Sequence, residues 1–224
     1  MFSHPSTAAM INGESEPVWE SVRPVPMVTI DFGNGQVVRR TLHGNIATWI
    51  SDSRGRVVDV IPGIYEQQAF EARLRPILAL ARRLGKLSDE TFAAEVRAYH
   101  KGALSFAPGH SVAGLADMSK KRLEGPTEDF LARGSRLRAE FSESDQAERV
   151  AAALLLDTEK NEAERRPRIH RHLLEAGVTQ VEKETRWLYA QVLHTDLDDP
   201  WLGLLPTLFG TDPFGDREFH RQQR

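Results

Sequence analysis

The sequence predicts an α+β protein: a small sheet with hairpins lies in the N-terminal third, and a helical region of about five helices follows. Three observations support this fold class. Apolar and polar residues alternate from Met27 onward, two turn signals each join a pair of such runs, and apolar residues recur every three or four positions after Tyr65. Because strand patterns precede helix patterns instead of alternating with them, the α+β class is favoured over α/β.

Two pairs of strands are expected between Met27 and Pro62. The run MVTIDF alternates, the turn residues Gly33, Asn34 and Gly35 follow it, and QVVRRTL returns as its partner. The runs IATWIS and RVVDVI flank a second turn at 52–55, which begins with Asp and ends with Gly. Each pair therefore predicts a β-hairpin.

Helical spacing dominates the rest of the chain. Pro76 is expected to kink or interrupt the first helix, and Ser88 can cap the second. The first helix carries one apolar stripe made of Phe70, Leu74, Ile77, Leu78, Ala81 and Leu84. Further helical patterns cover 111–123, 126–141, 144–165, 167–177 and a final stretch from Thr179, with Pro167 expected to separate two of them.

These patterns divide the chain into four segments. We expect a flexible arm at 1–26, a sheet with its helix at 27–86, a helical region at 87–195, and an apolar docking tail rich in Pro and Gly at 196–224. No internal repeat is visible.

Composition excludes several classes of function. The formal net charge is −3, from 29 basic and 32 acidic side chains, so no overall field favours nucleic acid. The start lacks a secretory pattern, and charges break every apolar run before it reaches membrane-spanning length. We therefore expect a cytoplasmic protein without a membrane span, a nucleic-acid partner or a cofactor. The chain has no cysteine, which rules out thiol–disulfide chemistry.

Residues 44–74, GNIATWISDSRGRVVDVIPGIYEQQAFEARL, resemble the second half of a thioredoxin-like domain. A strand, a tight hairpin, a second strand, a glycine at Gly63 and a final helix follow in that order. The chain is also similar to a group of bacterial thioredoxin-fold proteins with a helical extension, in which a segment like DPWLG at 199–203 recurs. The resemblance implies a truncated thioredoxin-like core. The redox site is missing, because the chain has no CxxC and Gly44-Asn45-Ile46 stands where the family has its cis-proline.

A metal site is one candidate for chemistry in the helical region. Asp157, Asn161 and Glu164 are spaced four and three apart and so share a helix face, and further possible ligands lie nearby. Carboxylates with a histidine can hold a divalent metal. The alternative is a solvated polar face or a buried polar network between helices. The candidate ligands are Asp157, Glu162, Glu164 and His170.

The C-terminal tail is the candidate partner-binding segment. Its large apolar side chains follow no helical or strand period, so they must dock either on this chain's own helices or on another subunit. They are Trp201, Leu202, Leu204, Leu205, Leu208 and Phe209.

The sequence thus favours a non-catalytic accessory or subunit protein, a redox-inactive thioredoxin-like module for protein–protein interaction within a larger assembly. The alternative is a metal-dependent enzyme that uses the carboxylate and histidine set. A small-molecule carrier with its site between sheet and helices also stays open.

Overall fold

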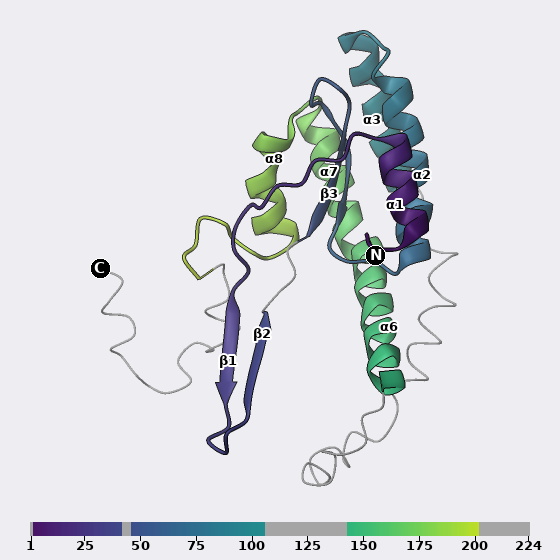
Figure 1. Cartoon of the computed structure of the whole chain (residues 1–224). Coiled ribbons are helices and arrows are strands. Elements are labelled where there is room, and N and C mark those ends of the chain that lie inside the picture. The colour runs from purple at the N-terminus through teal and green to yellow at the C-terminus, as the bar shows by residue number, and fades with distance from the viewer. Residues whose placement is uncertain (1, 42–45, 106–142, 202–224) are drawn as a thin grey trace, which may run out of the picture. The chain divides into compact units, whose positions relative to one another are not determined.

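The computed structural model of this chain describes residues 2–41, 46–105 and 143–201, and it confirms the α+β class (Figure 1). The chain divides into two compact units. The larger unit comprises residues 1–19 and 46–181, and the smaller unit comprises 20–45 and 182–224. The predicted helices at 111–123 and 126–141 lie outside the described residues.

Both predicted hairpins are present, as two separate antiparallel sheets among the described strands. In the smaller unit β1 (Met27–Asp31) pairs with β2 (Val37–Thr41). In the larger unit β3 (Ala47–Ser51) pairs with β4 (Val57–Pro62), with a register shift after Ile50. Every residue of β4 is buried, whereas β1 is almost entirely exposed. The two hairpins therefore play different parts: β4 is a core strand and β1 is a surface strand.

The core of the larger unit is built on α2 (Gln67–Leu84) and α3 (Asp89–Ser105). The whole predicted apolar stripe of α2 is buried, and α2 packs on β3 and β4. Pro76 lies inside α2 and does not divide it. From α3, Phe92 and Val96 complete the core.

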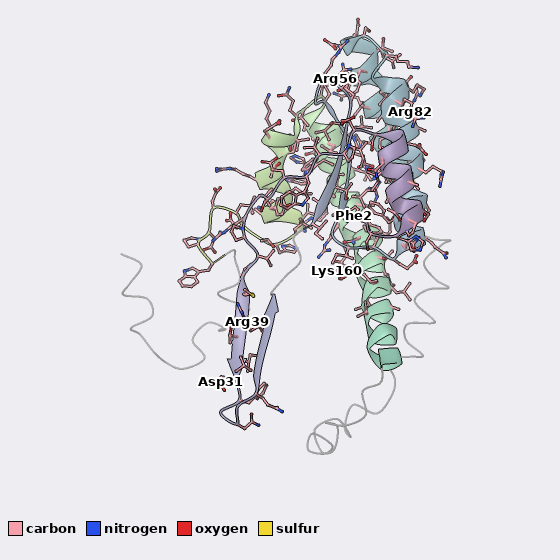
Figure 2. The ribbon with its side chains drawn as sticks, in the orientation of Figure 1. Phe2, Asp31, Arg39, Arg56, Arg82 and Lys160 are labelled. Atoms are coloured by element: carbon pink, nitrogen blue, oxygen red, sulfur yellow. The ribbon has the colours of Figure 1, made fainter. Side chains whose placement is uncertain are left out.

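Part of the expected N-terminal arm is helical. Helix α1 (Pro5–Glu14) packs on α2 and contributes Met10 to the core, which explains why this segment is ordered despite its weak pattern (Figure 1). Polar contacts support it: Thr7 donates to Glu71 over 2.6 Å, and Arg82, labelled in Figure 2, lies 3.0 Å from Glu14.

One continuous helix crosses three segments of the larger unit. It runs through α6 (Glu143–Lys160), the π-helical turn η1 (Asn161–Arg165) and α7 (Arg166–Ala176), and ends at Gly177 as predicted. The expected break at Pro167 is absent. Proline lacks an N–H and its ring clashes with the carbonyl four residues earlier, and the wider π turn just before it relieves both problems without ending the helix.

The smaller unit joins segments that are far apart in the sequence. Arg23 donates to the backbone carbonyls of Asp199 at 2.6 Å and Pro200 at 2.8 Å. The α8 helix (Val181–Trp187) continues into the π-helical turn η2 (Leu188–Val192), whose Leu188 and Val192 are buried. Within the described ranges, no helix combines the length and apolar character needed to cross a membrane.

Candidate functional site

Asp59 is a charged residue in the middle of the buried strand β4, where its carboxylate accepts three hydrogen bonds. Its Oδ1 accepts the N–H of Val60 at 2.7 Å. Its Oδ2 accepts the Tyr99 hydroxyl at 2.5 Å and Arg166 Nη2 at 2.8 Å. A carboxylate without solvent needs such donors, because an uncompensated buried charge is costly.

Arg166 joins the helix α7 to the strand β4 and to a histidine. Its Nη1 donates to the carbonyl of Val60 at 3.1 Å, and its Nη2 lies 2.8 Å from Asp59 and 3.0 Å from His170 Nε2. Since His170 is one helical turn after Arg166, α7 presents both side chains on the same face. The guanidinium therefore fixes the ring orientation of His170.

Two buried histidines extend this chain of contacts. His170 Nδ1 lies 2.9 Å from Nδ1 of His100 on α3, the neighbouring helix. We call Asp59, Tyr99, His100, Arg166 and His170 the buried network.

The donors in the buried network assign its histidine tautomers. An arginine only donates, so His170 Nε2 must accept and a neutral His170 carries its proton on Nδ1. That proton is donated to His100 Nδ1, so a neutral His100 carries its own proton on Nε2. His100 is fully buried, and none of the described residues accepts a hydrogen bond from its Nε2. The chain of hydrogen bonds therefore runs from the Asp59–Arg166 ion pair through His170 to the Nε2–H of His100, which no described residue accepts.

Burial and the ion pair set the protonation states. Burial alone raises the pKa of Asp59, but the Arg166 charge, the two histidines and the Tyr99 hydrogen bond together lower it to about 2. Burial lowers the pKa of His170 to about 4, with Asp59 opposing and Arg166 reinforcing that shift. Burial also lowers the pKa of His100. At neutral pH the buried network therefore holds one ion pair and two neutral imidazoles.

A second acidic group lies on the other side of Arg166. Glu162 Oε1 is 3.9 Å from Arg166 Nε, and its Oε2 is 2.6 Å from Arg73 Nη2. Burial and the Glu162 charge raise the pKa of the buried Tyr65 hydroxyl. The negative charges of Asp59 and Glu162 are thus balanced by the positive charges of Arg166 and Arg73.

Asp59, His100 and His170 also place one potential ligand atom each within 4.8 Å of one another. Two imidazoles and a carboxylate suit divalent transition metals. However, Arg166 donates to both Asp59 and His170, and a guanidinium cannot lose its proton to make room for a second cation. A metal would have to displace Arg166, so the observed geometry fits a hydrogen-bonded relay better than a coordination site.

The four metal ligands expected from the sequence do not come together. Asp157 and Glu164 are exposed, Glu162 is paired with Arg73, and only His170 belongs to the buried network. Helical spacing predicted that these residues share one face, but Asn161 and His170 are buried whereas Asp157 and Glu164 are exposed. Asn161 donates to the carbonyl of Ile64 at 2.8 Å. The alternative stated for these residues, a buried interhelical polar network, describes the His170 end.

Sequence reasoning missed Asp59, Tyr99, His100 and Arg166. Asp59 had a usable signal, since it is a lone charge within the apolar strand run RVVDVI. The other three became neighbours only when α3 and α7 packed together.

The predicted docking tail is described only at its start. Trp201 is about half exposed, at 48%. Leu202, Leu204, Leu205, Leu208 and Phe209 lie outside the described residues.

Comparison of the chain with protein-family models, with curated proteins and with solved structures finds no match. The thioredoxin-like resemblance of residues 44–74 thus stays a prediction from the sequence.

Proposed function

We propose that this chain is a non-catalytic accessory or subunit protein that acts by binding other proteins. One observation carries the proposal: large apolar side chains are exposed along a single stretch of the sequence. Of the thirteen exposed large apolar residues among those described, seven fall within residues 18–37. They are Val18, Trp19, Val25, Met27, Ile30, Phe32 and Val37.

Five of the seven, from Val25 to Val37, lie in the smaller unit, and such a concentration within one stretch of sequence is unusual for residues that meet only water. Single exposed apolar residues are common, but a run of them marks an interaction site. Val18 and Trp19 are 88% and 87% exposed, so the residues that the structure describes cover little of their apolar surface. Tryptophan is also the residue type most often found at the energetic centre of protein interfaces.

The buried network supports the non-catalytic part of the proposal. Its carboxylate accepts three hydrogen bonds and its cation is paired with that carboxylate. Asp59 and His100 are fully buried, and Arg166 and His170 are only 5% exposed. A catalytic acid or base must reach a substrate, whereas these groups hold β4, α3 and α7 together.

The test is the mass and composition of the complex that the tagged chain forms in its native cells. We expect one stoichiometric partner protein, which is lost in Trp19→Ser and retained in Val150→Ser. Val150 is a matched control, because it is an exposed apolar residue outside the 18–37 stretch. A single uncomplexed chain in native extracts, for both wild type and variants, would contradict the proposal.

A metal-dependent enzyme is the second candidate, favoured by the convergence of Asp59, His100 and His170. Metal analysis of the same purified sample separates it from the first. A stoichiometric divalent metal that is lost in His100→Ala would support the enzyme and displace the accessory role.

A further inference from the structure

The β1–β2 hairpin has two edges that no other described strand covers. Among the described strands β1 pairs only with β2, and the two form a sheet of their own (Figure 1). A two-stranded sheet is marginally stable by itself, and a free edge with apolar side chains is a template for another strand. Met27, Ile30 and Phe32 are exposed on or next to β1, and Val37 is exposed on β2.

The ladder shows which backbone groups of β1 point outward. Phe32 N–H donates to the carbonyl of Gln36 at 3.1 Å, so this pair is a hydrogen-bonded one. In an antiparallel ladder such pairs alternate with pairs that are not hydrogen-bonded. Ile30 and Val28 therefore bond to β2, whereas the N–H and C=O groups of Met27, Thr29 and Asp31 face the free edge.

The two edges of the hairpin differ in charge. The sequence of β2, VVRRT, is basic, and antiparallel pairing with a second β2 about its central residue would place Arg39 opposite Arg39. The sequence of β1, MVTID, has a single charge at its end (Figure 2 labels Asp31 and Arg39). The β1 edge is therefore the one that suits a second copy.

Strand β1 is also complementary to itself. When two copies run antiparallel about Thr29, Val28 lies opposite Ile30 and Met27 lies opposite Asp31, so the two Asp31 side chains stay at opposite ends. Thr29 faces Thr29 on the twofold axis, as an isologous contact requires. The outward groups of Met27, Thr29 and Asp31 then supply about six hydrogen bonds between the strands.

We propose that two copies of this chain associate through their β1 strands, forming a continuous four-stranded antiparallel sheet in the order β2–β1–β1–β2. The proposal rests on the proposed function, since it names a second copy as one partner. It accounts for the open β1 edge and brings Val28 of each copy beside Ile30 of the other.

The first test uses proline to remove one outward donor. Thr29→Pro deletes the outward N–H but leaves the β1–β2 ladder intact, because the bonds to β2 come from Val28 and Ile30. Thr29→Val keeps the N–H and is the matched control. Sedimentation velocity of the full chain is expected to show a dimer for wild type and Thr29→Val. In Thr29→Pro, two lost intersubunit bonds raise the dissociation constant about thirtyfold.

The second test uses the absence of cysteine in this chain. Thr29→Cys places two thiols on the twofold axis, where facing Cα atoms are about 5.5 Å apart, within the range that a disulfide spans. Mild oxidation is expected to crosslink Thr29→Cys into a covalent dimer. Ser53→Cys, at an exposed turn of the larger unit, is expected to stay monomeric on denaturing gels.

The outcomes separate this inference from the proposed function. A wild-type monomer at high micromolar concentration, or a dimer unchanged by Thr29→Pro and not crosslinked in Thr29→Cys, overturns the β1 interface. If a different protein still co-purifies from native cells in that case, the accessory role stands and only the second copy is excluded. Loss of that partner in Thr29→Pro would instead assign the β1 edge to the other protein.

Discussion

His170 makes the stability of the larger unit sensitive to pH. Its pKa is lowered to about 4 by burial, against about 6.5 for an unperturbed histidine. Between these values the unfolded chain binds more protons than the folded one, so stability falls as pH falls. The charged and titratable groups that influence it are Asp59, Arg166, His100 and Arg73.

We expect the free energy of unfolding to drop by about 2 kcal/mol between pH 7 and pH 5 because of His170 alone. Urea denaturation at the two pH values measures it. In His170→Gln this loss is expected to shrink markedly. Asp59 does not contribute to this loss between pH 7 and pH 5. Its pKa is lowered from 3.8 to about 2, so the stability that its charge provides is lost only as the pH falls from about 3.8 toward 2. An equal loss in wild type and His170→Gln would show that another group titrates.

At the scale of elements, the loop that joins β4 to α2 and the turn η1 approach each other at a glycine. Gly63 has a φ of +72°, and a Cβ there would lie 3.0 Å from Arg165 Nη1 and 3.1 Å from Asn161 Oδ1. Those two side chains are themselves joined, since Arg165 donates to Asn161 over 2.6 Å. A side chain at Gly63 must therefore both adopt a strained backbone conformation and push this pair aside.

Gly63→Ala is expected to lower the free energy of unfolding by about 2 kcal/mol, measured by chemical denaturation. Gly55→Ala separates the two causes. Gly55 has a φ of +76° but nothing within 4 Å of its missing Cβ, so that variant carries only the backbone cost, about 1 kcal/mol. Equal losses in both variants would mean that η1 yields to the added methyl group without cost.

At the scale of the whole larger unit, Arg166 is the residue through which three elements meet. It contacts Asp59 and the carbonyl of Val60 on β4, and it orients His170, which in turn contacts α3. Breaking a buried ion pair from one side leaves an uncompensated charge, which costs more than the pair contributes.

Arg166→Met is expected to destabilise the chain by about 3–5 kcal/mol, measured by thermal or chemical unfolding. The double variant Asp59→Asn/Arg166→Met should lose less than the sum of the two single variants, because it removes both charges together. Additive losses would indicate that the two side chains act independently.

Local patterns in the sequence were sufficient to predict the α+β class, both hairpins and the apolar stripe of α2, because strand alternation, turn residues and helical spacing are local properties. Local pattern also misled. It predicted a flexible arm at the N-terminus, where helix α1 in fact packs on the core through Met10. It also predicted a helix break at Pro167, where the π-helical turn η1 lets the helix continue.

The candidate site, by contrast, is made by contacts between segments that are distant in the sequence. His100 and His170 are 70 residues apart in the sequence, yet their rings are in contact. Asp59 and Arg166 are 107 residues apart and form an ion pair. No local spacing encodes such pairs, since they form when apolar burial brings β4, α3 and α7 together and leaves their polar side chains without water. Asp157 and Glu164, at helical spacing, are exposed, whereas Asn161 between them is buried and donates to the carbonyl of Ile64.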